Sequence, residues 1–148
     1  MLTLDTIKLE CQIQKIFLKM ISQISTYMVS MVLGIMVFFS FVVAPITFTV
    51  LDEENSKKFI RKIFPYYYTV SLLICFLVLI FFVIQKIFSL NFYLLLTVAI
   101  LFALSNYILM PLINKYKDEN QDKKFKYSHF ISVVINFTQM ILLVIILI

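Results

Sequence analysis

The sequence has 148 residues, of which 62% are hydrophobic and 14% are charged, and its formal net charge is +5 at pH 7. Soluble domains carry about 45–50% apolar and about 25% charged residues, so this composition excludes an ordinary soluble protein. The length suits one domain. We expect no nucleic-acid partner, because every basic cluster flanks an apolar segment and suits phospholipid headgroups better.

Four long segments without Asp, Glu, Lys or Arg dominate the chain. They cover residues 20–51, 63–85, 87–114 and 127–148. A helix needs about 20 apolar residues to cross a bilayer, and membrane strands would alternate apolar and polar side chains, which these segments do not. We therefore predict an all-α membrane protein, a four-helix transmembrane bundle with an amphipathic N-terminal helix. The predicted spans are about 21–50, 64–85, 90–111 and 127–148.

Residues 1–19 are predicted to form the amphipathic helix, and residues 20–148 a single transmembrane domain. The apolar side chains of the helix recur at helical spacing on one face: Leu9, Ile13, Ile16, Phe17 and Met20. The polar side chains on another face are Lys8, Gln12, Lys15 and Lys19. Such a helix either lies on the membrane surface or continues straight into the first span.

The first span carries two features that affect helix packing. Small residues recur every four positions, at Ser22, Thr26, Ser30 and Gly34. Such a row lets helix backbones approach closely in lipid. Near the end of the span, Pro45 has no N–H to donate, so we expect the carbonyl near Phe41 to lose its partner and the helix to kink.

The connection after the first span, residues 52–63, is short and basic. Ser56 is the expected N-cap of a short interfacial helix, and Pro65 is expected to mark its junction with span two. Only a handful of residues join spans two and three, which predicts that these two helices are antiparallel neighbours.

Span three is predicted to end at Pro111, and the polar loop 114–126 leads to span four with Asp122 as its expected N-cap. This loop and loop 52–63 together carry nine Lys and Arg residues, whereas the other segments outside the spans carry four. The positive-inside rule therefore predicts that both loops are cytoplasmic and both termini lie outside. The abundance of Lys, Ile, Phe and Asn suggests an AT-rich bacterial genome, and hence a bacterial inner membrane.

The predicted spans hold no Asp, Glu, Lys or Arg, which removes the usual carriers of ion transport and acid–base catalysis. No catalytic, phosphate-binding or zinc-binding sequence pattern occurs, so we expect no enzyme activity, no cofactor and no metal site. The single titratable side chain within a predicted span that ionises near neutral pH is His129.

Polar side chains gather on one face of each of the last two spans. Span four carries His129, Ser132, Asn136 and Gln139, and span three carries Asn106, Met110 and Asn114. The short connections bring the start of span two and the proline end of span one to the same membrane level. The candidate polar layer at this end of the bundle consists of His129, Ser132, Asn136, Asn114, Tyr67 and Pro45.

Three interpretations of this layer stay open. In the first interpretation, its members form hydrogen bonds between helices and to the carbonyls freed by Pro45 and Pro111. Alternatively, they line a pocket for a small ligand or a lipid headgroup, with His129 as the titratable group. In the third interpretation, His129 holds a haem or a metal ion across a dimer.

The chain carries four distinctive short motifs: Phe-Val-Val-Ala-Pro-Ile-Thr-Phe at 41–48, Ile-Phe-Pro-Tyr-Tyr at 63–67, Pro-Leu-Ile-Asn at 111–114 and His-x-x-Ser-x-x-x-Asn at 129–136. Their arrangement resembles the transmembrane protein 205-like family of four-helix membrane proteins, a domain-of-unknown-function family. The resemblance covers roughly residues 25–145 and implies fold and location, but no reaction. The matching positions that it implies are Pro45, Phe48, Pro65, Asn114, His129, Ser132 and Asn136. The acidic segment 52–55 departs from the family pattern, so the start of helix two is expected to differ.

The sequence supports three functional hypotheses. In the first, a non-enzymatic membrane component binds or passes a small molecule or ion through the polar layer. In the second, the chain is a structural or assembly subunit of a larger membrane complex, and the small-residue row of span one contacts a homo-oligomer or another partner. In the third, the chain is a His129-dependent haem or metal redox protein. The lipid bilayer is the expected partner in all three.

Overall fold

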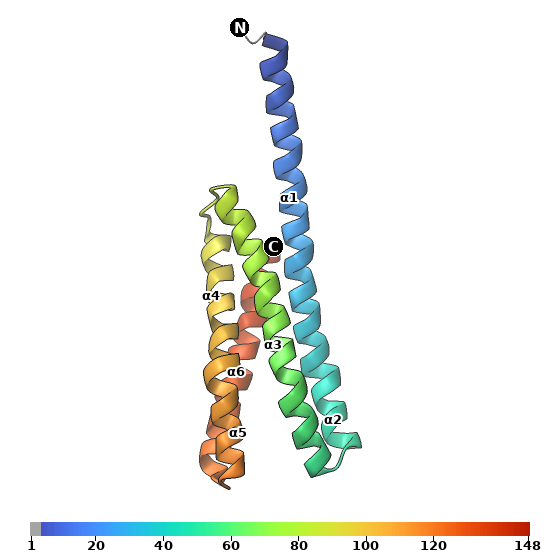
Figure 1. The fold of residues 1–148 in the computed structure, drawn as a ribbon, viewed down its shortest axis with the longest axis vertical. Helices are drawn as coiled ribbons and strands as arrows, with labels where there is room; N and C mark the ends of the chain where they lie inside the picture. Colours follow the sequence, from blue (N-terminus) through green and yellow to red (C-terminus); the bar gives the residue numbers. More distant parts are fainter. Residues whose placement is uncertain (1–3) are drawn as a thin grey trace.

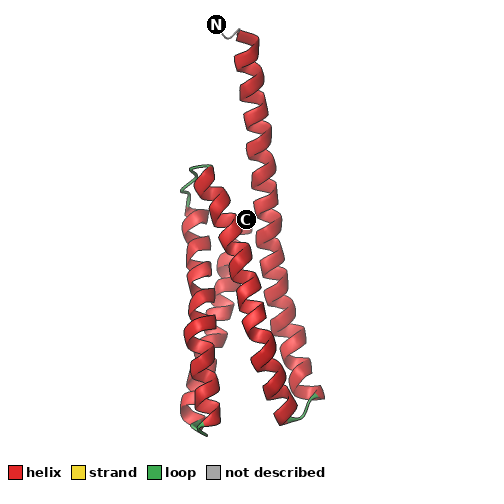
Figure 2. Cartoon of the chain, viewed as in Figure 1, coloured by secondary structure: helices red, strands yellow, loops and turns green. Residues whose placement is uncertain are grey.

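The structure, a computed structural model, describes residues 4–148, with side chains described from residue 8 onward. These residues form long helices joined by short loops and contain no strand (Figure 2). The elements are α1 (Leu4–Phe38), η1 (Phe39–Val43), α2 (Ala44–Val50), α3 (Glu53–Ile84), α4 (Leu90–Leu104), η2 (Ser105–Leu109), α5 (Met110–Asp118) and α6 (Asp122–Leu147). Residues 1–3 of the predicted N-terminal helix lie outside the described residues.

Four continuous helical rods are long and apolar enough to cross a membrane. They are Lys8–Val50, Glu53–Ile84, Leu90–Asp118 and Asp122–Leu147. The predicted all-α, four-span fold class is therefore confirmed. The N-terminal amphipathic helix continues straight into the first span as part of α1, so the structure has the second of the two arrangements that the sequence allowed.

The helices pack as a bundle around α3 and α6 (Figure 1). α3 packs against α1 and α4, and α6 packs against α1, α4 and α5. Residues 85–89 turn the chain from α3 into α4, so these two helices are antiparallel neighbours as expected (Figure 1). The N-terminal part of α1 extends well beyond the other helices (Figure 1).

Pro45 and Pro111 each follow a turn of π-helix rather than ending a helix. In η1 the N–H of Ala44 bonds to the carbonyl of Phe39, and in η2 the N–H of Met110 bonds to the carbonyl of Ser105. A π turn holds one more residue than an α turn, so the chain accommodates the missing N–H of proline without breaking. Helical structure therefore continues past Pro111, as α5, to Asp118.

The start of α3 also differs from the sequence prediction. Asp52, not Ser56, is the N-cap, and its Oδ1 accepts a hydrogen bond of 2.8 Å from the N–H of Asn55. Ser56 is buried and donates its hydroxyl to the carbonyl of Thr47 at 3.1 Å, which joins α3 to the end of α2. Pro65 lies inside an uninterrupted helix, so the interfacial segment and span two form one element.

The predicted cap of the last helix is displaced by one residue. Gln121 occupies the N-cap position of α6, and Asp122 lies in the first turn. A carboxylate in the first turn still interacts favourably with the helix dipole. The predicted polar loop 114–126 therefore reduces to a short connection between α5 and α6.

The core is a narrow apolar column contributed by all four rods. Its most deeply buried apolar side chains are Val32, Met36, Cys75, Val78, Leu95, Val98, Phe102 and Leu143. The predicted small-residue row of α1 takes no part in this core, because Ser22, Thr26, Ser30 and Gly34 are all exposed. The hydroxyls of Thr26 and Ser30 bond to carbonyls of their own helix.

Two ion pairs connect α3 to the end of α5, beyond the apolar part of that helix. Asp118 Oδ1 lies 2.7 Å from Arg61 Nη2 and 2.6 Å from Lys57 Nζ. Hydrogen bonds from Arg61 and then from Lys57 lower the pKa of the Asp118 carboxyl to about 2 from its ordinary value of 3.8. The carboxylate therefore stays charged at any physiological pH.

A methionine pair on α1 tests where the core lies. Met36 is fully buried, whereas Met31 is 59% exposed on the same helix. We expect Met36→Ala to lower the free energy of unfolding in mixed micelles by about 2–5 kcal/mol, because it opens a cavity in the core. Met31→Ala is the matched control and should change that free energy by no more than about 0.5 kcal/mol. Equal losses for the two variants would contradict the packing of α1.

The Asp118 ion pairs have a defined pH dependence. Because the folded-state pKa lies below the ordinary value, the stabilisation is fully present above pH 3.8 and is lost as the pH falls through about 2. We expect Asp118→Asn to lower the thermal unfolding temperature of the micellar protein slightly, and by the same amount at pH 8 and pH 5. The difference from the unmodified chain should shrink below pH 3.8, and a difference that changes between pH 8 and pH 5 would refute this assignment.

Candidate functional site

A pocket of about 740 Å³ lies at the end of the bundle where α2 meets α3 and α5 meets α6. η1, α2, the first half of α3, α5 and the first half of α6 contribute its walls. Figure 1 shows these elements together at the end of the bundle opposite to the projecting part of α1. The pocket therefore occupies the membrane level at which the sequence predicted a polar layer.

A chain of hydrogen bonds links three helices at the inner end of the pocket. The Tyr67 hydroxyl donates to Asn136 Oδ1 at 2.9 Å, and Asn136 Nδ2 donates to Ser40 Oγ at 2.9 Å. The ring of Phe39 stacks on Tyr67 with the centroids 4.8 Å apart. Polar groups within a membrane protein need such partners, so this network fixes η1, α3 and α6 relative to one another.

The π turn before Pro45 gives η1 its place in this network. Ser40 lies within the turn and Ala44 follows it directly, and both line the pocket. The extra residue of a π turn changes the direction in which the following side chains point. Pro45 itself is exposed and does not line the pocket, so its contribution is to the backbone of η1 and not to the pocket wall.

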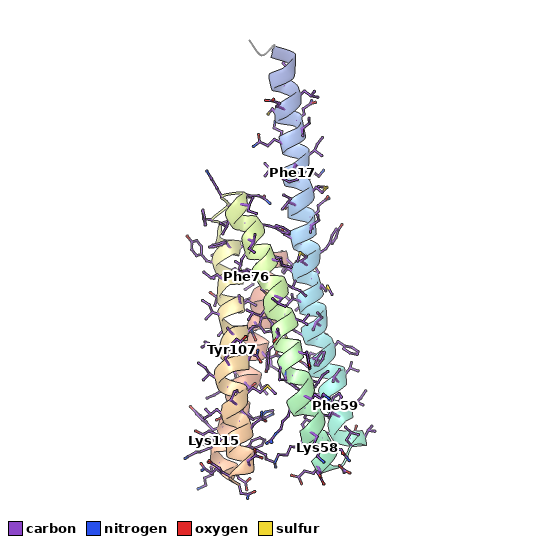
Figure 3. The ribbon with its side chains drawn as sticks, viewed as in Figure 1. Phe17, Lys58, Phe59, Phe76, Tyr107 and Lys115 are labelled. Atoms are coloured by element: carbon purple, nitrogen blue, oxygen red, sulfur yellow. The ribbon has the colours of Figure 1, made fainter. Side chains whose placement is uncertain are left out.

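The mouth of the pocket is charged and has more positive than negative groups. Lys57, Arg61 and Lys117 line it together with Glu53, and Lys117 Nζ lies 3.2 Å from Glu53 Oε1. Asp118 neutralises one more cation through the ion pairs described above. Three cations therefore face two carboxylates, which leaves one positive charge uncompensated. Lys58 and Lys115 extend outward at the same end of the bundle (Figure 3).

One side wall of the pocket is aromatic and open. Phe41 and Phe48 contribute from η1 and α2, and Val133 and Phe137 from α6. Their side chains remain exposed, with exposed fractions of 64% for Phe48 and 46% for Phe137. An edge-to-face contact of 6.3 Å between the rings of Phe41 and Phe137 is the link between the two sides of this wall. Because these residues lie within membrane-spanning helices, the open side faces the lipid.

Five of the six predicted layer residues line the pocket: Tyr67, Asn114, His129, Ser132 and Asn136. Asn114 contributes its carbonyl, which accepts a 3.3 Å hydrogen bond from Arg61 Nη2. His129 is exposed, and its ring stacks on that of Phe125 with the centroids 5.9 Å apart. It therefore lies at the rim of the pocket.

Two further members of the predicted polar faces lie outside the pocket. Asn106 donates to Thr69 Oγ1 at 3.3 Å, and Gln139 donates to the carbonyl of Val98 at 3.3 Å in the fully buried core. Below the pocket floor, Met36 and Met140 are buried in the apolar column. This column separates the pocket from a second cavity of about 140 Å³ at the other end of the bundle.

The cationic residues at the mouth are the functional candidates that the sequence reasoning missed. Lys57 and Arg61 belong to the basic segment 52–63, for which the sequence predicts only an interfacial helix. The two residues are four positions apart, which places both on one side of α3. This spacing is the sequence signal that identifies them as a cationic pair. Nothing in the sequence identifies Asp118 as the partner, because it lies 57 positions from Arg61.

The chemistry available at the pocket is that of binding groups. Among the side chains that the structure describes, residues 8–148, no three His, Cys, Asp or Glu converge as they do in a metal site. The pocket instead combines cations, amide and hydroxyl groups, and aromatic rings. Such a set recognises a molecule with one charged end and one apolar end.

The comparisons with known proteins give a family and no function. No curated protein and no solved structure matches the chain. The family described as "Domain of unknown function (DUF4149)" matches residues 27–122. This region contains η1, the whole of α3 and all of α5, and hence most of the pocket. This match extends over more than half of the chain, so the chain belongs to the DUF4149 family of unknown function.

Proposed function

We propose that the chain is an integral membrane protein that binds an amphipathic molecule with an anionic head group in the pocket at the α2–α3 end of the bundle. The observation that carries the proposal is the position of Lys57, Arg61 and Lys117 at the mouth of a pocket whose side wall is aromatic and open to lipid. In this arrangement, the head group lies at the mouth and the apolar body lies against the aromatic wall.

The size and polarity of the pocket support this ligand class. A volume of about 740 Å³ lies within the range of roughly 300–1,000 Å³ that is usual for small-molecule sites. The uncompensated positive charge favours an anion, and a guanidinium binds carboxylate or phosphate oxygens in a two-pronged geometry. Tyr67, Asn136 and Ser40 already satisfy one another, so the floor closes the pocket and leaves recognition to the mouth.

Binding accounts for this arrangement better than passage or catalysis. Passage through the bundle requires a path through the column that Met36, Phe102 and Leu143 fill below the floor. Catalysis by a carboxylate at the mouth requires a free Glu53 or Asp118, and both are held by lysine or arginine side chains. The proposal therefore includes neither step, and it includes no haem or metal ion at His129.

The location of the protein is part of the proposal. We place segments 52–63 and 114–126 in the cytoplasm, which the nine Lys and Arg residues in those segments support. The bacterial inner membrane is proposed from the abundance of Lys, Ile, Phe and Asn. The resemblance to the transmembrane protein 205-like family supports the same multi-pass arrangement. In this orientation the pocket mouth faces the cytoplasmic leaflet, which holds anionic lipids.

Tryptophan quenching by brominated lipids tests the proposed ligand class. The sequence contains no tryptophan, so Phe137→Trp places a single reporter in the pocket wall. The protein is reconstituted in phosphatidylcholine vesicles with brominated phosphatidylglycerol or brominated phosphatidylcholine at equal mole fraction. We expect stronger quenching by the anionic lipid. Arg61→Gln should reduce its relative affinity by about tenfold, because a charge-assisted hydrogen bond is lost.

Two matched controls make this measurement decisive. Tyr107→Trp reports from a side chain on η2 that is 68% exposed and does not line the pocket, so the two brominated lipids should quench it equally. Lys86→Gln removes one positive charge at the opposite end of the bundle and should leave the preference at Phe137→Trp unchanged. Equal quenching of Phe137→Trp by the two lipids would overturn the proposal.

Cysteine labelling in intact cells tests the proposed orientation. In a chain with Cys11→Ser and Cys75→Ser, single cysteines replace Glu54 and Ser89, which are exposed at opposite ends of the bundle. We expect a membrane-impermeant maleimide to label the position at Ser89 and to reach the position at Glu54 only after the cells are permeabilised. Labelling of Glu54→Cys in intact cells would place the pocket mouth outside.

A further inference from the structure

The N-terminal part of α1 lies beyond the end of the bundle. The small cavity at that end brings Ser22 and Ser25 of α1 level with Gln85, Asn91 and Leu147, where the other helices begin or end. The residues before Ser22 therefore project past the bundle by roughly 27 Å, at 1.5 Å per helical residue (Figure 1). This part contains Lys8, Lys15 and Lys19 and lies outside the charge-free segment that crosses the membrane.

The projecting part has an apolar face that nothing in the chain covers. Leu9, Ile13, Ile16 and Met20 are between 49% and 69% exposed. Figure 3 shows the neighbouring Phe17 on the same uncovered stretch of helix. Exposure of such side chains is ordinary in lipid but unfavourable in water, where burial of Leu, Ile or Met side chains stabilises a contact. This face therefore requires a partner outside the chain.

The apolar face belongs to a seven-residue repeat that continues into the membrane. Alternating steps of four and three residues run along α1, and we call these positions the α1 seam. They are Leu9, Ile13, Ile16, Met20, Gln23, Tyr27, Ser30, Gly34 and Val37, and all of them are exposed. The residues of α1 that face the bundle are Val29, Val32 and Met36, and they lie about half a turn away from the seam. The seam is thus the face of α1 opposite to the bundle.

We propose that the α1 seam is the contact with a second copy of this chain, in a parallel two-stranded coiled coil. A repeat of this spacing brings one edge of two helices together over many turns. Two copies with the same orientation in one membrane present α1 in the same direction, so each seam residue meets its own counterpart across a two-fold axis. The contact is continuous from water into lipid.

Two seam residues have no role within the chain but have one in such a dimer. Gly34 is the sole glycine of the sequence, and a Cβ at this position would meet nothing within 4 Å. Glycine lowers helix stability, but it allows two helices to approach closely in lipid, as does Ser30 one turn earlier. Gln23 lies at the boundary between the projecting part of α1 and its membrane-crossing part. A polar residue in the seam of a coiled coil fixes the register of the two helices.

The size and charge of the α1 seam also suit a second copy. The nine seam residues and their flanking positions supply roughly 16 residues per chain, just below the 20–30 of a standard interface of about 800 Å² per partner. Confinement of both copies to one membrane compensates for this smaller size. Lys8 and Lys15 lie on a side of the helix away from the seam, so their charges do not face each other.

Disulfide scanning of the full-length chain in its own membrane tests this interface. In a chain with Cys11→Ser and Cys75→Ser, single cysteines replace Ile13, Ile16 and Met20 on the seam, and Gln14, Lys15 and Leu18 off it. After oxidation with copper phenanthroline, we expect the seam positions to give at least fivefold more disulfide-linked dimer. Facing seam positions are close enough for a disulfide, whereas outer positions are separated by about two helix diameters.

Native Cys11 is a built-in control, because it is exposed but lies off the seam. The chain that retains only Cys11 should cross-link as weakly as the variants at Gln14 and Lys15. A water-soluble maleimide should label all of the positions in the monomer that detergent produces, which shows that the thiols can react. Uniform or absent cross-linking would overturn the proposal. Protection of Ile13→Cys from the maleimide in membranes without cross-linking would show a helix that lies on the lipid surface, and would also overturn it.

Discussion

The fold depends on one constraint, which is that polar groups within a bilayer must find partners inside the protein. The four charge-free segments satisfy their backbones as helices, and Pro45 and Pro111 are accommodated by π turns instead of breaks. The same constraint brings Tyr67, Asn136 and Ser40 into one hydrogen-bonded chain. That chain joins three helices and forms the floor of the pocket, so the element that stabilises the bundle also defines its site.

The pocket and the α1 seam are separate surfaces: the pocket lies at the α2–α3 end of the bundle, whereas the seam runs along the outer face of α1 from Leu9 to Val37. At the pocket end of the bundle, cations lie at the mouth beside an aromatic wall. At the other end, α1 continues alone and has no neighbour to cover its apolar face. No seam residue lines the pocket, so a ligand and a second copy do not compete for the same side chains.

The local errors of the sequence predictions have a common cause. Ser56 and Asp122 are good capping residues by type, yet Asp52 and Gln121 occupy the N-cap positions. Proline usually ends a helix, yet Pro65 lies inside α3 and Pro111 follows η2 within a continuous helical rod. Local preferences of about 1–3 kcal/mol are small enough for tertiary contacts to outweigh them. The buried Ser56 illustrates this, because its hydroxyl joins α2 to α3 and is not available for capping.

The sequence alone determined the four membrane-crossing helices and the polar face of α6, because both depend on the spacing of residues along one helix. It also placed Tyr67, Asn114, His129, Ser132 and Asn136 at one membrane level, since short connections restrict where helix ends can lie. Only the tertiary structure decided that Arg61 and Lys57 meet Asp118, that Ser40 closes the pocket floor and that Pro45 lies outside it. It also decided which face of α1 is left uncovered. These features depend on the rotation of each helix about its axis, which contacts between residues distant in the sequence determine.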